Sequence, residues 1–309
     1  MISMKTIKIY SPATVANLVC GYDILGMALN GPGDEMELSL SEEPGIMIRH
    51  LDGYGLPTIP SKNVAGVSLL ALLDSYPGKT GFSLVVNKKI KPGSGLGSSA
   101  ASAAGAVVAA NHLLNDHFSR EELVQFAMNG EKLASGVMHA DNIAPCIYGG
   151  VTLIRSLNPL DIIPLNAPAL FITVIHPQIE VKTSDARQIL RKEIPLKDAV
   201  RQWANIAGLV TGLLKSDYEL ISRSLEDGII EPVRSILIPG FDLLKKSCRE
   251  AGALGGGISG SGPSVFMLSR DESTAKNVEQ AMIEVYQRVG LDFQTHVTTV
   301  NEEGVKIIG

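Results

Sequence analysis

The segment 92–114 joins a stretch rich in Gly and Ser to a strong helix former. It begins PGSGLGSS and continues AASAAGAVVAANHLL, a run dominated by Ala and Val. The start of a helix carries unpaired N–H groups and partial positive charge, and glycines before it let backbone amides approach an anion. The segment therefore predicts a loop that wraps a phosphate and a slim helix that points its dipole at it. A flexible surface loop before a buried helix is the alternative, which one such motif alone leaves open.

The loop matches neither of two common nucleotide-binding fingerprints. The chain contains no G-x-x-x-x-G-K-[ST] sequence, and the loop lies mid-chain without the acidic residue after a following strand that a Rossmann fingerprint requires. Ser98 and Ser99 stand where the helix should begin, so they either cap it or offer hydroxyls to a phosphate or a metal ion. Lys88, Lys89 and Lys91, just upstream, either add positive charge or belong to a solvated turn.

The composition excludes several other classes of protein. With 45% hydrophobic and 19% charged residues, the chain of 309 residues has the balance of a compact globular protein. A net charge of −5 and 5% aromatic residues argue against a nucleic-acid partner. No apolar run is long enough for a membrane span and no signal peptide is visible, so we expect no membrane partner. Cys20, Cys146 and Cys248 are widely spaced, which indicates reduced thiols and predicts a soluble, cytoplasmic protein.

Hydrophobic periodicity predicts paired strands early in the chain and helices concentrated later. Expected strands are 5–10, 35–41, 81–87, 149–156, 169–175, 265–268 and 293–300; expected helices are 63–76, 98–114, 120–134, 184–192, 197–214, 217–226, 240–250 and 272–289. Ser119 and Glu122 form an S-x-x-E capping box. This order favours an α+β fold over a regular βαβ alternation. The segment 157–168 carries three prolines, is expected to be irregular and is a candidate domain junction.

Three segments in this order resemble signature sequences of the GHMP kinases and, within that family, of the homoserine kinases. SPATVANLVCGYDILGMAL (11–29) resembles the N-terminal signature, KPGSGLGSSAASAAG (91–105) the ATP loop and GGGISGSGPSVF (255–266) the C-terminal glycine motif. Three further segments are also similar to homoserine kinases, namely 135–151, 181–190 and 229–240. One glycine loop is weak support for a family, but six ordered segments over nearly the whole chain are strong support.

The resemblance implies an enzyme of two domains, 1–160 and 161–309. The first would resemble the second domain of ribosomal protein S5, the second would be a ferredoxin-like α/β plait, and the active site would lie between them. The implied reaction transfers the γ-phosphoryl group of ATP to the side-chain hydroxyl of L-homoserine, giving O-phosphohomoserine on the route to threonine. The resemblance also implies Mg²⁺ as a cofactor and a homodimer.

The resemblance assigns an ATP site as well. The loop would cradle the phosphates and the segment 61–63 would contact adenine; the matched positions are Ser61, Lys62, Asn63, Lys91, Pro92, Gly93, Ser94, Gly95, Leu96, Gly97, Ser98 and Ser99. Ser99 or Ser98, together with Glu131, would hold Mg²⁺ through hard oxygen ligands. Taken alone, Glu131 also fits a solvated residue near a helix end. We expect the segment 255–266 to close over the site, since glycines permit close approach of backbone.

The implied acceptor is a small zwitterion with a hydroxyl group, so its site needs cations for the carboxylate and acceptors for the ammonium. Arg187 and Arg234 match the two carboxylate-binding arginines of the family, and a guanidinium grips a carboxylate bidentately. The other matched substrate positions are Asn17, Asp23, His139, Asp141 and Asn142. Alone, each has a structural explanation: a surface arginine, an Asx turn or a hydrogen-bonded core histidine.

The sequence does not single out a catalytic base. Relatives such as mevalonate kinase use an Asp–Lys pair, and Thr14 stands here where that lysine would be expected. Asp141 can accept the hydroxyl proton and Asn142 can orient the hydroxyl; with Arg187 they are the residues expected to act in catalysis. Because a loose, metaphosphate-like transition state asks little of a base, we expect catalysis mainly by alignment and charge stabilisation.

Alternatives remain open at this point. Val19, Cys20 and Tyr22 differ from the residues usual in the family's first motif, which leaves the shape of the acceptor pocket open. A GHMP kinase for another small alcohol, such as mevalonate or a sugar, is the nearest alternative, although a neutral sugar gives the paired arginines nothing to bind. A sensor that binds ATP and an amino acid without turnover is the alternative from another class.

Overall fold

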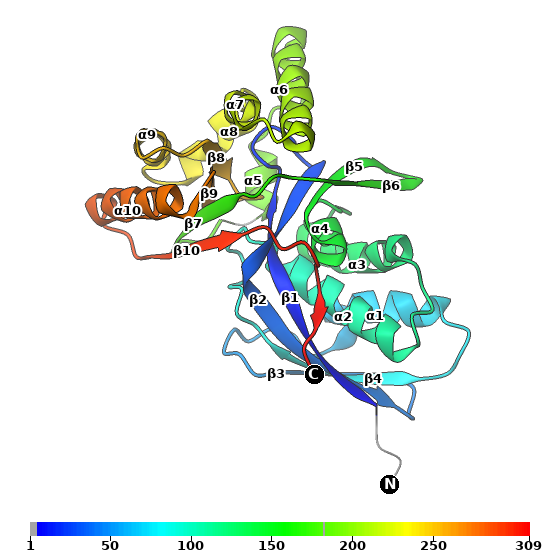
Figure 1. Ribbon diagram of the computed structural model, residues 1–309. Helices are drawn as coiled ribbons and strands as arrows, with labels where there is room; N and C mark the ends of the chain where they lie inside the picture. The colour runs from blue at the N-terminus through cyan, green and yellow to red at the C-terminus, as the bar shows by residue number, and fades with distance from the viewer. Residues whose placement is uncertain (1–4, 182) are drawn as a thin grey trace.

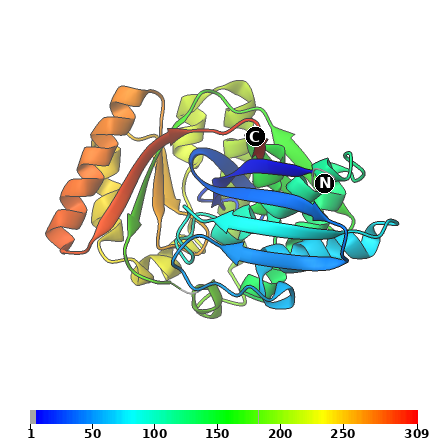
Figure 2. The same ribbon diagram turned by 90° about the horizontal axis from the view of Figure 1, so that it is seen from below.

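The computed structural model describes residues 5–181 and 183–309 and contains two β-sheets (Figure 1). The first sheet has the order β11-β1-β2-β4-β3, while β5 pairs with β2 and β6 pairs with β5. Its strands are β1 (Thr6–Ala16), β2 (Leu25–Ser41), β3 (Gly45–His50), β4 (Gly81–Asn87), β5 (Val151–Leu157), β6 (Leu160–Leu165) and β11 (Lys306–Ile307). The pairs are antiparallel except for β3 with β4. Seen from below, the strands of this sheet lie side by side (Figure 2).

A layer of helices covers one face of the first sheet (Figure 1). These helices are α1 (Val64–Ser75), α2 (Ser98–Leu113), α3 (Arg120–Ser135) and α4 (Ile143–Tyr148). α2 is buried along most of its length, because its alanines allow close contact with β1 and β2. Ser119 and Glu122 form the predicted capping box of α3. In contrast to α3, the N-cap residue of α2 is Gly97, which has no side chain. No side chain therefore caps the first N–H groups of α2.

The second sheet has the order β10-β7-β9-β8, with each pair antiparallel. Its strands are β7 (Phe171–Pro177), β8 (Gly255–Ile258), β9 (Val265–Ser269) and β10 (Phe293–Thr299). α9 (Phe241–Glu250) and α10 (Glu272–Val289) pack on it around an apolar core that includes Leu244, Met282 and Tyr286 (Figure 1). The order of strands and helices along this half is that of a ferredoxin-like α/β plait, as predicted.

The connection from β7 to β8 is helical. It contains α5 (Thr183–Gln188), α6 (Leu196–Lys215), α7 (Tyr218–Ser224), α8 (Glu231–Arg234) and the short 3-10 helix η2 (Ser235–Leu237), and it ends with α9. A second 3-10 helix, η1 (Pro60–Lys62), precedes α1. Within residues 5–181 and 183–309, no helix combines the length and the apolar character that crossing a membrane requires.

The predicted α+β fold is confirmed, and most predicted elements lie close to their expected bounds. The prediction of an irregular segment at 157–168 is wrong, because β6 lies within it and pairs with β5. The sequence patterns also missed β3, α4, α8, β8 and β11. The division into domains 1–160 and 161–309 remains a proposal, and the strand pairing adds that β6 and β11 both belong to the first sheet.

Candidate active site

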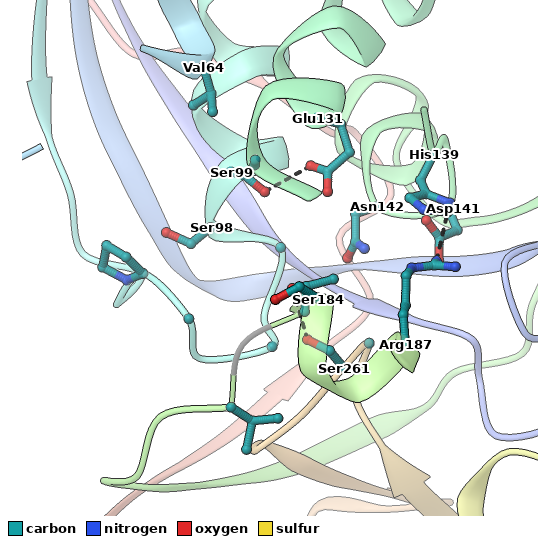
Figure 3. A pocket seen from close by; sticks show the side chains of 18 of the residues that line it. Val64, Ser98, Ser99, Glu131, His139, Asp141, Asn142, Ser184, Arg187 and Ser261 are labelled. Carbon is teal, nitrogen blue, oxygen red and sulfur yellow. Dashed lines mark hydrogen bonds between the residues drawn. The ribbon is translucent and has the colours of Figure 1, made fainter. Parts of the chain in front are cut away.

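A pocket of about 510 Å³ is lined by residues from both halves of the chain (Figure 3). The glycine loop at 92–97 and the adjoining ends of α2 and α3 form one part of its wall. The turn after β1, the start of α4 and side chains from α5 and α8 form another part. The pocket therefore joins the predicted phosphate loop to the predicted acceptor residues.

The glycine loop turns through three left-handed residues. Gly93, Gly95 and Gly97 have φ angles of 74°, 81° and 65°. A Cβ atom on Gly97 would lie 2.0 Å from Oγ1 of Thr14, and one on Gly95 would lie 2.6 Å from the carbonyl oxygen of Gly262. Both the backbone conformation and the surrounding space therefore require glycine at these two positions.

Neighbouring segments hold this loop by its carbonyl groups. The N–H of Thr14 donates to the carbonyl of Leu96 at 3.2 Å, and the Ser259 hydroxyl donates to the carbonyl of Gly95 at 2.7 Å. These bonds direct the two carbonyls toward the protein. Such an arrangement suits a loop whose backbone N–H groups, together with the start of α2, bind an anion.

Lys88 and Asp34 form a buried ion pair next to the loop. Nζ of Lys88 lies 2.5 Å from Oδ2 of Asp34, and the two side chains are 2% and 0% exposed. The same Nζ donates to the carbonyl of Ser98 at 3.0 Å and to the hydroxyl of Ser102 at 2.8 Å, both in α2. Lys88 thus ties β2 to the start of α2, which decides against a solvated turn at this residue.

Ser99 and Glu131 meet where the start of α2 faces α3. Oγ of Ser99 donates to Oε2 of Glu131 at 2.8 Å (Figure 3). Burial raises the pKa of Glu131, and hydrogen bonds from Ser99 and Ser135 oppose this effect. The Ser98 hydroxyl donates instead to the carbonyl of Ile90 at 2.8 Å. Of the two serines, Ser99 is the one that presents its hydroxyl to Glu131.

The segment 17–23, which follows β1, has an unusual backbone conformation. Asn17, Val19 and Asp23 have φ angles of 73°, 68° and 60°. A β-branched residue such as Val19 is an outlier in this region, and strained residues of this kind cluster at functional sites. Nδ2 of Asn17 donates to the carbonyl of Gly260 at 3.0 Å, and its Oδ1 accepts from the N–H of Asp23 at 3.1 Å. Asn17 therefore fixes this turn against the C-terminal glycine motif.

Arg234 brings a buried positive charge to the pocket. The residue is 3% exposed, and it donates to the carbonyls of Ala186 at 3.1 Å and Gly260 at 2.9 Å. Its Nη2 also donates to the hydroxyl of Tyr22 at 3.5 Å. In the part of the chain that the structure describes, its partners are thus neutral oxygens. A buried guanidinium with neutral partners favours an incoming anion.

Arg187 has a carboxylate partner and shares an aromatic contact with Arg234. Nη2 of Arg187 donates to Oδ1 of Asp23 at 2.7 Å. The ring centroid of Tyr22 lies 5.5 Å from Cζ of Arg187 and 5.0 Å from Cζ of Arg234. An aromatic face attracts both guanidinium groups and so helps to hold two like charges near each other. The departure from the family pattern at Tyr22 therefore lies in direct contact with the predicted carboxylate site.

Three further predicted residues, His139, Asp141 and Asn142, face the pocket around the start of α4 (Figure 3). Burial raises the pKa of Asp141 to about 7, helped by the nearby negative charges of Asp23 and Glu131. Burial also lowers the pKa of His139, which favours its neutral form. The Asp141 carboxyl can therefore take up or release a proton near neutral pH.

Thr14 orients the side chain of Asn142. Its hydroxyl donates to Oδ1 of Asn142 at 2.7 Å, and Thr14 is fully buried. Because Oδ1 of Asn142 accepts this bond, the Nδ2 group is the donor that Asn142 offers to the pocket. Thr14 thus acts on a neighbouring side chain of the pocket.

The structure gathers most of the predicted site residues around this one pocket. Those that line it are Asn17, Asp23, Pro92, Gly93, Gly95, Gly97, Ser98, Ser99, Glu131, His139, Asp141, Asn142, Arg187 and Arg234. Gly260 and Ser261 also line it, as expected for the segment 255–266. Six predicted ATP residues do not line it, namely Ser61, Lys62, Asn63, Lys91, Ser94 and Leu96. Asn63 uses its side chain to cap α1, and Lys91 donates to Gln178.

Several lining residues were not predicted from the sequence. Leu56 and Val64 add apolar surface near the glycine loop. Glu180, which precedes α5, and Thr183 and Ser184, which begin it, also line the pocket. The last two fall in the segment 181–190, whose resemblance to the family was the available signal. Leu56 and Val64 carry no polar group, so nothing in the local sequence distinguishes them from core residues.

Comparisons with known proteins find matches to both halves of the chain. The family model of the GHMP kinases N terminal domain matches residues 63–150, and the model of the GHMP kinases C terminal matches residues 209–288. The chain is 45% identical to a homoserine kinase of Chloroherpeton thalassium, over 99% of this chain and 100% of that protein. It is also 45% identical to one of Chlorobium phaeobacteroides, over 99% of this chain and 100% of that protein. A crystal structure of homoserine kinase from Cytophaga hutchinsonii aligns with a TM-score of 0.95 and 49% identity, over 100% of this chain and 99% of that one.

Proposed function

The chain belongs to the homoserine kinases of the GHMP kinase family, and we infer from this that it transfers the γ-phosphoryl group of ATP to the side-chain hydroxyl of L-homoserine. The product is O-phospho-L-homoserine, an intermediate of threonine biosynthesis. The observation that carries the proposal is the buried guanidinium of Arg234, which lines the pocket and has neutral oxygen partners. An amino-acid acceptor supplies the carboxylate that this group favours, whereas a neutral sugar does not.

We place the phosphates of ATP against the glycine loop and the first turn of α2. The positive φ angles of Gly93, Gly95 and Gly97 let the backbone curve around an anion without side chains in the way. The 16 residues of α2 direct the positive end of their dipole to the same place. Leu56 and Val64 offer apolar surface for the adenine ring, and Val64 directly follows the segment 61–63 that the family resemblance assigns to adenine.

The proposed magnesium ligands are Ser99 and Glu131. Their oxygens are already adjacent and face the pocket, and Mg²⁺ prefers such hard oxygen donors. No cluster of three or more His, Cys, Asp or Glu side chains suited to a metal occurs among the described residues. This agrees with an ion that takes its remaining ligands from phosphates and water, as Mg²⁺ commonly does. When bound, Mg²⁺ would neutralise charge on the transferring phosphates.

At the other end of the pocket we place the acceptor. Its carboxylate would bind Arg234 and Arg187, and its ammonium would bind Asp23 and Oδ1 of Asn17. Asn142 lies between Arg187 and the pair Ser99–Glu131 in Figure 3, so a hydroxyl that contacts Asn142 points toward the phosphate end. The carbon chain of the acceptor would thus span the distance from the two arginines, which bind its carboxylate, to the phosphates of ATP.

Catalysis is proposed to depend mainly on alignment. Nδ2 of Asn142, fixed by Thr14, donates to the acceptor oxygen and orients it toward the phosphate. Asp141 receives the hydroxyl proton late in the reaction, since its pKa near 7 suits a group that changes protonation at neutral pH. His139 stays neutral and completes the wall of the pocket. Positioning and charge neutralisation supply most of the rate in phosphoryl transfer, so no stronger base is required.

An ADP-release assay with Mg-ATP tests the function. L-homoserine is compared with mevalonate, galactose, L-serine and no acceptor. We expect turnover that is selective for L-homoserine. Turnover with another acceptor alone would contradict the assigned acceptor while keeping the ATP loop. Measurable ATP binding without turnover of any acceptor would favour the sensor that the sequence left open.

A homodimer and a cytoplasmic location complete the proposal. The exposed side chains of Leu196, Val200 and Trp203 follow the four- and three-residue spacing of a helix–helix seam on α6, which projects from the molecule (Figure 1). Leu214, also exposed, lies near the end of the same helix. We propose that a second copy of the chain covers them. Sedimentation equilibrium tests this, and a monomer at micromolar concentration would contradict it. The three cysteines are free thiols, which agrees with a reducing compartment.

A further inference from the structure

The two arginines of the acceptor site differ in how their charges are balanced. Nη2 of Arg187 lies 2.7 Å from Oδ1 of Asp23, and these side chains are 25% and 29% exposed. Arg234 is almost fully buried and bonded to carbonyl and hydroxyl oxygens. The charge of Arg187 is therefore balanced by a carboxylate of the protein itself, whereas Arg234 has neutral hydrogen-bond partners among the described residues.

We propose that the Asp23–Arg187 ion pair is a latch that selects acceptors carrying both an ammonium and a carboxylate group. This inference rests on the proposed function. A zwitterion provides a new partner for both side chains at once, because its carboxylate binds Arg187 while its ammonium binds Asp23. An acceptor that has only the carboxylate must draw Arg187 away and leave Asp23 without a cation. Selectivity then has two sources. An acceptor without an ammonium group must break the Asp23–Arg187 ion pair without replacing it, and a zwitterion gains contacts to both side chains.

The surroundings of Arg187 allow this exchange of partners. Its Nε is buried and has no hydrogen-bond partner among the residues that the structure describes. Its guanidinium stacks on the ring of Tyr22, a contact that does not depend on which anion it binds. Nδ1 of His139 lies 3.5 Å from the same Nη2 that binds Asp23. Tyr22 and His139 thus keep the guanidinium in the pocket when its carboxylate partner changes.

The backbone of Asp23 does not depend on the ion pair. The residue has a φ of 60°, and its N–H donates to Oδ1 of Asn17. Asn adopts this left-handed conformation as readily as Asp does. The substitution Asp23→Asn therefore removes the charge while it preserves the size of the side chain and the conformation of the turn.

The decisive probe is 4-hydroxybutanoate, which is L-homoserine without its ammonium group. Its dissociation constant and that of L-homoserine are measured by titration calorimetry with the full chain. Asp23→Asn should bind 4-hydroxybutanoate about tenfold more tightly than the wild type does, because Arg187 is released. It should bind L-homoserine at least about tenfold more weakly. Unchanged or weaker binding of 4-hydroxybutanoate, including undetectable binding to both proteins, overturns the latch.

A second variant tests the same pair from its other side. Arg187→Gln leaves Asp23 as a free carboxylate, which repels 4-hydroxybutanoate and still attracts the ammonium of L-homoserine. The latch predicts that the preference for L-homoserine over 4-hydroxybutanoate rises in Arg187→Gln. Equal weakening of both ligands would mean that the two side chains act independently and would overturn the proposal. This variant decides the matter if Asp23→Asn does not fold.

The matched control is Asp185→Asn, which removes an exposed carboxylate from the same helix as Arg187. Both dissociation constants should stay at their wild-type values. A separate measurement, the release of ADP with L-homoserine, tests the proposed function. A wild-type protein that releases no ADP with L-homoserine contradicts the proposed function. Normal turnover of L-homoserine, with a preference that neither pocket variant alters, contradicts the latch alone.

Discussion

Nζ of Lys88 lies 2.5 Å from Oδ2 of Asp34 in a site closed to solvent, and the same ammonium group donates to the carbonyl of Ser98 at the start of α2. Asp34 also accepts from the N–H groups of the two residues that follow Lys88. The pair therefore connects β2, the end of β4 and the helix terminus that we assign to the phosphates of ATP.

Lys88→Met should lower the free energy of unfolding by about 3–5 kcal/mol, because it leaves the carboxylate of Asp34 buried without its cation. Urea denaturation followed by circular dichroism measures this. The double substitution Lys88→Met with Asp34→Asn should recover most of the loss, since no buried charge remains and the amide oxygen can still accept from the two N–H groups. A single variant as stable as the wild type would show that the pair does not hold α2 in place.

Thr14→Val should lower kcat by about tenfold and leave KM for ATP nearly unchanged. Val has the shape of Thr but lacks the hydroxyl that fixes Asn142, so the acceptor oxygen is less well aligned. Steady-state kinetics measure both constants. Thr14→Ser keeps the hydroxyl and is expected to retain most of the activity. Equal kcat values for Thr14→Val and the wild type would exclude Thr14 as a positioning residue.

Asp141→Asn should reduce kcat by less than about tenfold, since alignment rather than base strength is expected to limit the rate. A general base commonly contributes about 10²–10⁴-fold. A loss of that size, together with an acid limb near pH 7 in the wild-type rate profile that the variant lacks, would make Asp141 a true base. Rates with L-homoserine between pH 5 and pH 9 decide between the two roles.

The same residue predicts how stability changes with pH. Burial raises the pKa of Asp141 from 3.8 to about 7, so the folded protein holds this proton more tightly than the unfolded chain. The resulting stabilisation is complete below pH 3.8 and is lost as the pH rises toward 7. Asp141→Asn imitates the protonated form at every pH. Its melting temperature should therefore exceed that of the wild type at pH 8 by roughly 2 °C or more, and match it near pH 4. A lower melting temperature at pH 8 would contradict the assigned burial effect.

Much of this site could be predicted from the sequence because its signals are local. The glycines before α2 and the Ser119–Glu122 capping box depend on the chain within a few residues, and both have the predicted form. The acceptor residues could be assigned only through family resemblance. Asn17, Arg187 and Arg234 come from distant segments, and no local pattern relates them.

What the sequence did not predict depends on tertiary contacts. β8 contains the glycine run 255–257, which strand propensity disfavours. A Cβ on Gly256 would lie 2.0 Å from the carbonyl oxygen of Phe266, so close packing requires glycine there. Lys88 looked like part of a solvated basic turn because its partner, Asp34, is far away in the sequence. Tyr22 was noted only as a departure from the family motif, since its stacking on two arginines becomes visible only in three dimensions.

Arg234→Met should raise KM for L-homoserine by about 100-fold, because it removes a buried charge-assisted contact to the carboxylate. KM for ATP should change little, since Arg234 is held by Ala186, Gly260 and Tyr22 and not by the glycine loop. Arg234→Lys is the informative companion. It keeps the charge but cannot reproduce the bonds to two carbonyls together with a bidentate grip on the ligand.

The lysine variant should therefore lie between the wild type and Arg234→Met, with KM for L-homoserine raised by about tenfold. Full activity of Arg234→Lys would mean that charge alone is recognised. Equal loss in the two variants would mean that the geometry of the guanidinium decides. Wild-type KM values in Arg234→Met would contradict the carboxylate site itself, because the acceptor would then not contact the one buried cation that the structure leaves with neutral partners in the described pocket.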